Sequence, residues 1–102
     1  MTQVEIIGRD EKELRIALNG EIDSGNAEEF YKTVLSAYEQ APASLVFSCD
    51  GLEFIDSTTL GTFVKLLKKV KTEGFSMKLV GLQAKIKKLF LICSLDTIME
   101  IA

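Results

Sequence analysis

Residues 54–61 read Phe54-Ile55-Asp56-Ser57-Thr58-Thr59-Leu60-Gly61, an apolar pair followed by an acid and three hydroxyls. The preceding residues, Ser44 to Asp50, have the apolar character of a short buried strand. The following residues place apolar side chains at the spacing of one helix face, namely Leu60, Phe63, Val64 and Leu67. A strand therefore leads into a helix, and we expect Asp56 or Ser57 at the N-cap, where a side-chain oxygen accepts from first-turn N–H groups.

The composition indicates one globular domain that spans residues 1–102. Of these residues 47% are hydrophobic and 26% are charged, which is enough apolar material for a single core. The net charge of −3 argues against direct nucleic-acid binding, because phosphates must be neutralised by clustered cations. Lysines do cluster at residues 65–71 and 85–88, and we interpret both clusters as solvated helix faces.

Cysteine use and the N-terminal sequence predict a reduced, cytoplasmic protein. Cys49 and Cys93 are too few for a disulfide framework, and each lies in an apolar context typical of a buried thiol. Residues 1–5 lack the basic and apolar regions of a secretion signal. Apolar stretches also stay short of the roughly 18 residues of a membrane span, so membrane insertion is not expected.

Histidine is absent from the chain, which removes much catalytic chemistry. Ser-His and Cys-His pairs and imidazole metal ligands are excluded. The two cysteines lack the spacing of a zinc site, and the sequence contains no glycine-rich phosphate loop. We therefore expect no catalytic residue, no bound metal and no cofactor.

The N-terminal part of the chain predicts a hairpin and a helix. Residues 3–7 and 14–19 read as two strands joined by a polar turn. Residues 20–26 are dense in turn formers and read as a loop. A helix is expected from Ala27 to just before Pro42, with Asn26 and Glu29 forming a capping box.

The remaining chain continues the alternation of strands and helices. The prediction gives a strand at residues 45–49, a turn at Asp50-Gly51, a helix from Ser57 to about Lys71, a strand at 76–81, a helix at 83–92 and a half-strand at 98–101. In the last helix the inward residues are expected to be Ile86, Leu89, Phe90 and Cys93.

The order ββαβαβα predicts an α/β domain with a mixed, mostly parallel sheet and helices packed on it. Ligands and partners of such sheets gather at the carboxyl ends of the strands. Two loops leave such ends here, at residues 20–26 and 50–57. They should bring Asp23, Ser24 and Gly25 beside Asp56, Ser57 and Thr58. The expected site is a small acidic, hydroxyl-rich surface rather than a deep pocket.

The motifs Gly20-Glu21-Ile22-Asp23 and, further along, residues 54–61 resemble the pattern of the STAS domain of bacterial anti-sigma factor antagonists. The resemblance extends over residues 1–102 and includes Leu89, Phe90, Ile92 and Leu95-Asp96. The Asp-Ser-Thr sequence alone is a weak signal. Its place after a buried strand, with Gly-Glu-Ile-Asp upstream, makes the match more specific.

The resemblance implies a partner-switching protein. In that family the first hydroxyl after the aspartate, here Ser57, is phosphorylated by a serine kinase that is also the anti-sigma factor. The unphosphorylated form binds this kinase and releases a sigma factor, and a metal-dependent serine phosphatase removes the phosphate. The chain would thus be a substrate and not an enzyme. The residues expected to contact the partner are Asp23, Ser24, Gly25, Asn26, Asp56, Ser57, Thr58, Thr59 and Gly61.

One position departs from the family pattern, which has glycine where this chain has Thr59. The β-branched side chain adds bulk to the first helical turn, which is consistent with a different partner geometry or with a paralogue of altered affinity. It also makes Thr58 and Thr59 competing phosphate acceptors, although Ser57 stands at the family's position.

Simpler structural roles remain open for several of these residues. Asp23 is as consistent with a residue that stabilises its own turn as with a partner contact, and Ser24 and Asn26 are consistent with helix caps. Gly61 is consistent with close packing of the helix on the sheet. The alternative functions are a STAS subunit that is never phosphorylated, within a larger signalling or lipid-transport assembly, and a small nucleotide- or ligand-binding module.

Overall fold

Strands and helices alternate along most of the chain, as the sequence predicts. The computed structural model describes residues 4–102. In chain order its elements are β1 (Val4–Arg9), β2 (Glu13–Ile22), α1 (Ala27–Gln40), β3 (Ser44–Ile55), α2 (Ser57–Thr72), β4 (Met77–Val80), α3 (Ala84–Ile92), a short 3-10 helix η1 (Leu95–Thr97) and β5 (Glu100–Ile101). The strands form one sheet in the order β1-β2-β3-β4-β5, in which β1 is antiparallel to β2 and the other neighbours are parallel. The α/β fold with a mixed, mostly parallel sheet is confirmed.

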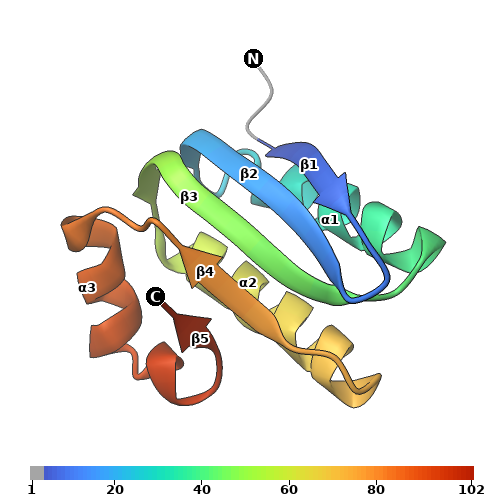
Figure 1. Ribbon diagram of the computed structural model, residues 1–102. Helices are drawn as coiled ribbons and strands as arrows, with labels where there is room; N and C mark the ends of the chain where they lie inside the picture. The colour runs from blue at the N-terminus through green and yellow to red at the C-terminus, as the bar shows by residue number, and fades with distance from the viewer. Residues whose placement is uncertain (1–3) are drawn as a thin grey trace.

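The helices lie on one side of this sheet, which explains the alternation of residues in β2. Figure 1 shows α1 and α2 behind the strands, with α3 beside the end of the sheet that carries β4 and β5. Leu14, Ile16 and Leu18 of β2 are fully buried toward the helices, whereas Arg15 is exposed on the opposite face. The period-two pattern thus matches a sheet with one covered face.

A chain of aromatic rings joins the layers of the core. Phe63 of α2 lies 5.3 Å from Phe30 of α1, 5.4 Å from Phe47 of β3 and 5.5 Å from Phe90 of α3, measured between ring centroids. Each pair is tilted edge to face, the arrangement that aromatic quadrupoles favour. Phe63 therefore contacts both of the other helices and the central strand.

The far ends of α1 and α2 are joined by a buried phenol. The Tyr38 hydroxyl donates a hydrogen bond of 2.5 Å to the Glu73 carboxylate, which also pairs with Lys69 at 2.9 Å. Burial raises the pKa of Tyr38, and the hydrogen bond from Tyr38 lowers the pKa of Glu73. The contact satisfies the one polar atom of Tyr38, whose ring lies in the core.

Strands β2 and β3 are longer than the sequence predicts. Gly20 and Gly51 were expected in a loop and a turn, but both lie inside strands, and the pairing of β2 with β3 shifts on either side of them. Gly20 has a φ of 71°, and a Cβ on Gly51 would lie 2.1 Å from the Asn19 Oδ1 atom. These glycines permit bulges within the strands, so the predicted loop at residues 20–26 shrinks to residues 23–26.

Helix α3 differs from its prediction in which side chains face inward. Ile86 and Phe90 are buried as expected, but Leu89 and Cys93 are exposed. The physical reason is that α3 contacts the core along one narrow stripe at the end of the sheet, where a 9-residue helix can bury only about one residue per turn.

Substitution of Phe63 by alanine should destabilise the fold by about 3–5 kcal/mol, because it leaves a cavity among three aromatic rings. Urea unfolding followed by circular dichroism measures this free energy. Phe54→Ala is the matched control, since Phe54 is 45% exposed, and it should cost much less. Equal losses from the two substitutions would contradict the central role of Phe63.

Candidate functional site

One carboxylate holds the corner between β3 and α2. Asp56 occupies the N-cap of α2 in an extended backbone conformation, and its Oδ1 atom accepts a hydrogen bond of 3.0 Å from the Thr59 N–H. Its Oδ2 atom accepts a second bond, of 2.9 Å, from the N–H of Ser24 in the β2–α1 loop. Of the two predicted cap residues, the cap is therefore Asp56, and Ser57 is the first residue of the helix. The predicted proximity of the two loops is confirmed.

The loop that faces Asp56 is fixed by its own side chains. Asp23 Oδ1 accepts from the Gly25 N–H at 2.9 Å, and Asn26 Oδ1 accepts from the Asp23 N–H at 2.9 Å. The Asn26 amide also donates to the Glu21 carbonyl. Within residues 4–102 the Asn26 side chain makes no cap hydrogen bond to α1, so the predicted capping box with Glu29 is wrong. The physical reason is that Asn26 closes the preceding turn instead.

Thr59 is buried beneath this corner. Its side chain has no exposed surface, and its hydroxyl donates to the Ile22 carbonyl at the end of β2. The same oxygen lies 3.1 Å from Asp56 Oδ1. Thr59 is therefore inaccessible as a phosphate acceptor and as a direct partner contact, which corrects both expectations. The Thr59 side chain points into the fold, and its hydrogen bond to Ile22 joins α2 to β2.

Helix periodicity contained the signal that would have placed Thr59 correctly. Thr59, Phe63, Leu66 and Val70 are buried along one stripe of α2, whereas the predicted Leu60 and Val64 are only half-buried. The buried face of α2 is thus rotated around the helix axis, toward Thr59, relative to the face that the sequence predicts. A threonine on an apolar stripe in the first turn commonly satisfies its hydroxyl through a neighbouring carbonyl.

Two hydroxyls and a glycine are exposed on the outer side of the corner. Ser57 and Thr58 are both exposed, and Gly61 follows Ser57 by one helical turn. A Cβ on Gly61 would meet no atom of residues 4–102 within 4 Å, so the predicted role in helix–sheet packing is wrong. Because Gly61 faces outward beside Ser57, its missing side chain leaves the approach to the Ser57 hydroxyl open.

A groove between α1 and α2 begins at this corner. It has a volume of about 580 Å³ and runs from Ser24 and Thr58 to Tyr31 and Lys65. The Lys65 Nζ atom lies 4.2 Å from the centre of the Tyr31 ring, within the range of a cation–π contact. Tyr31 and Lys65 were not predicted as site residues, because each reads as an ordinary member of its helix.

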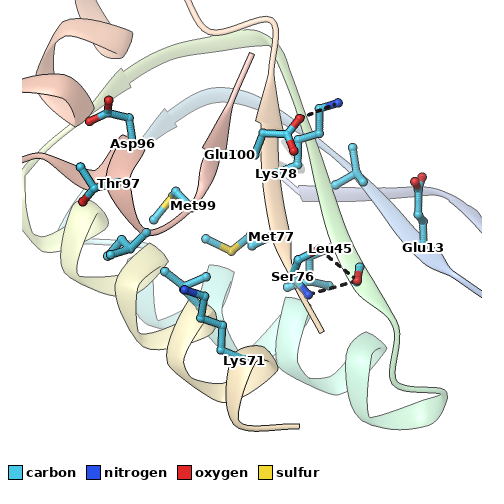
Figure 2. Close-up of a pocket in the computed structure, with 14 residues that line it drawn as sticks. Glu13, Leu45, Lys71, Ser76, Met77, Lys78, Asp96, Thr97, Met99 and Glu100 are labelled. Atoms are coloured by element: carbon cyan, nitrogen blue, oxygen red, sulfur yellow. Dashed lines mark hydrogen bonds and ion pairs between the residues drawn. The ribbon is translucent and has the colours of Figure 1, made fainter. Parts of the chain in front are cut away.

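A second hollow lies at the opposite end of the sheet (Figure 2). Its volume is about 480 Å³, and Leu45, Met77 and Met99 form its floor. Figure 2 shows Lys78 paired with Glu100 at its edge, at a distance of 3.1 Å. Leu45 and Met77 lie at the amino ends of β3 and β4, whereas Ser57 follows the carboxyl end of β3. None of the predicted site residues lines this hollow.

Comparison with known proteins places the chain in a family. The model of the STAS domain family matches residues 2–102. The chain belongs to the STAS domain family. The anti-sigma-B factor antagonist of Bacillus subtilis is 32% identical over 96 residues, which cover 94% of this chain and 87% of the relative.

Solved structures share the fold of this STAS domain. A Thermotoga maritima protein provisionally assigned as an anti-sigma factor antagonist is 27% identical, with a TM-score of 0.81 over 96% of this chain and 82% of its own. The Bacillus protein SpoIIAA in its phosphorylated form has a TM-score of 0.75 at 19% identity, over 97% of this chain and 90% of its own. The unphosphorylated form has a TM-score of 0.76 at 16% identity, over 97% and 86% of the two chains.

The described part of this STAS domain, residues 4–102, contains no group of three or more Cys, Asp or Glu side chains that could hold a metal ion. Over the same residues, no helix has the length and hydropathy to cross a bilayer. What the corner offers chemically is an exposed serine hydroxyl beside a fixed carboxylate.

Replacing Asp56 by alanine should lower the melting temperature at pH 7 and reduce the pH dependence of stability. The N–H groups of Thr59 and Ser24 hold the pKa of Asp56 below its ordinary value of 3.8. Its contribution is therefore present above pH 3.8 and is lost as the pH falls through the lower, folded-state pKa. The difference in melting temperature between wild type and Asp56→Ala should thus shrink in acid.

Thermal unfolding at pH 7 and at pH values below 3.8 measures this difference. Asp96→Ala is the control, because Asp96 is an exposed carboxylate elsewhere in the chain, and it should unfold close to wild type. A difference for Asp56→Ala that stays constant across the pH range would show that the carboxylate charge is not what joins the two loops.

Proposed function

We propose that this STAS domain is an anti-sigma factor antagonist that is switched by phosphorylation of Ser57. Its unmodified form binds an anti-sigma factor that is also a serine kinase, and binding releases a sigma factor. A metal-dependent serine phosphatase restores the unmodified form. The proposal is supported by relatives that carry the same role in their names and match this chain along nearly all of its length. It makes the chain a substrate and a binding partner in the cytoplasm, and not an enzyme.

The single observation that carries the proposal is the position of Ser57. Its hydroxyl is exposed at the first residue of α2, directly after the Asp56 cap that joins the two loops. A kinase must reach its acceptor, and Ser57 meets this requirement whereas Thr59 does not. Thr58 is also exposed but faces the groove between α1 and α2, so Ser57 is the acceptor that this geometry favours.

Electrostatics explains how one phosphate would disrupt a complex without unfolding the domain. A phosphoserine adds about −1.5 to −2 charge at neutral pH, and the N-terminus of a helix tolerates that charge well. A partner that covers Ser57 would have to desolvate this charge next to the Asp56 carboxylate. A loss of about 2–4 kcal/mol at the interface corresponds to about 30- to 1000-fold weaker binding.

Incubation with the cognate anti-sigma factor kinase and ATP should place one phosphate on Ser57, because its hydroxyl is exposed at the corner and, unlike Thr58, Ser57 does not line the groove between α1 and α2. Mass spectrometry of proteolytic peptides locates the phosphate. Ser57→Ala should remain unmodified, and Thr58→Ala, the matched control, should be modified as wild type is. Phosphate on Thr58, or none on either residue, would contradict the assignment.

Phosphorylation should weaken binding to the anti-sigma factor by about 30- to 1000-fold while the circular dichroism spectrum and melting temperature stay near those of the unmodified protein. Isothermal titration calorimetry with the unmodified and phosphorylated proteins measures the affinities. Ser57→Ala, which cannot be modified, should keep binding after treatment with ATP. Equal affinity of the phosphorylated and unmodified proteins would point instead to a STAS subunit without a phosphorylation switch.

A further inference from the structure

Helix α3 carries apolar side chains on its outer face as well as on its inner face. Ile86 and Phe90 are buried in the core, but Leu89, Leu91 and Ile92 are 38%, 45% and 68% exposed. Single exposed leucines are ordinary on protein surfaces, whereas Leu89 and Ile92 lie three residues apart on one face of this 9-residue helix and form a patch. The inner face is fully used by the fold, so the outer residues contribute little to stability.

Phe54 extends this patch from the helix to the sheet. It stands near the carboxyl end of β3 and is 45% exposed. Between it and α3 lies a groove of about 190 Å³, which Leu89, Lys85 and Glu53 also line. The volume suits one large apolar side chain. We call Phe54, Lys85, Lys88, Leu89 and Ile92 the α3 surface, because the last four recur at the spacing of one helix face.

The positive charge of α3 indicates the charge of a partner that would bind this surface. From Ala84 to Ile92 the helix has three lysines, Lys85, Lys87 and Lys88, and no acid, although the whole chain has a net charge of −3. Within residues 4–102 none of these lysines forms an ion pair. The groove wall includes one acid, Glu53, so the balance of the surface stays positive. The complementary surface carries carboxylates around an apolar side chain.

The α3 surface is linked to the site around Ser57 through the chain at the end of β3. Phe54 and Ile55 line the groove, and Asp56 and Ser57 follow them directly in the chain. We propose that the α3 surface is a second docking region for the same anti-sigma factor, and that it binds an acidic amphipathic segment of that partner with an apolar side chain in the groove. This inference rests on the proposed function.

A protein segment fits this surface better than a membrane does. The groove is concave and of the size of one side chain, whereas a lipid interface is best met by a broad apolar face. Ile86 and Phe90 also anchor α3 in the core, so the helix cannot turn more of its apolar surface outward. Lys85 and Lys88, on the same helix face as Leu89, supply charge for a local contact with carboxylates.

The test compares affinities of unmodified full-length variants for the anti-sigma factor, measured by calorimetry at low and high salt. Leu89→Asp and the double variant Lys85→Glu/Lys88→Glu should each bind about tenfold or more weakly than wild type. The salt dependence of binding should fall in the lysine variant, because its charges no longer attract the partner. Circular dichroism confirms that each variant is folded.

Matched control variants make the same kinds of substitution at exposed residues outside the α3 surface. Ile7→Asp changes an isoleucine that is 50% exposed on the edge strand β1, and Lys68→Glu/Lys71→Glu reverses two exposed lysines of α2. Both controls should bind within about twofold of wild type, since surface substitutions outside an interface have small effects. Phosphorylation of Ser57 in every variant shows separately that the corner is intact.

The outcomes separate this inference from the proposed function. Wild type that fails to bind the anti-sigma factor would overturn the proposed function. Wild type that binds, with both α3 variants at wild-type affinity, would overturn only the α3 inference. Sedimentation with phosphatidylglycerol–phosphatidylcholine vesicles adds a second arm. Vesicle binding that is lost in the lysine variant, with unchanged affinity for the anti-sigma factor, would also overturn it, in favour of a membrane surface.

Discussion

The Asp56 carboxylate is the contact on which the arrangement of the candidate site depends. Its two oxygens accept from two backbone N–H groups that are far apart in sequence, one in α2 and one in the β2–α1 loop. Thr59 adds a bond from the same turn of α2 to the end of β2. The exposed residues Ser57 and Thr58 are thus carried by a corner that is fixed from below, so a change in the charge of Ser57 need not disturb the core.

The element order and the meeting of the two loops could be predicted from the sequence, because hydrophobic period and strand direction determine both. The ends of β2 and β3 could not, since Gly20 and Gly51 are turn formers locally and become bulges only when paired with a neighbouring strand. The inner face of α3 was ambiguous because the helix is apolar on both faces. The burial of Thr59 follows from the helix period, because Thr59 lies on the same stripe of α2 as Phe63 and Leu66.

In this small domain the residues that hold the core together and the exposed residues of α3 and of the corner at Ser57 are separate sets. The aromatic contacts of Phe63 hold the layers together on the inside of the sheet. The exposed serine, the glycine beside it and the outer residues of α3 add nothing to that core. Partner preference can therefore change among relatives by surface substitution while the fold is retained.

The register shifts between β2 and β3 also determine which face of the sheet the later side chains of β3 point to. Between paired ends β2 advances from Glu13 to Ile22 while β3 advances from Ser44 to Ile55, and the extra length of β3 enters at two separate shifts in register. One extra residue would turn every later side chain of β3 to the opposite face, and the second turns them back. Ile55 therefore faces the core, as Phe47 does before the two shifts. The direction in which β3 delivers its last side chain is thus decided several residues before its end, because the number of these irregularities is even.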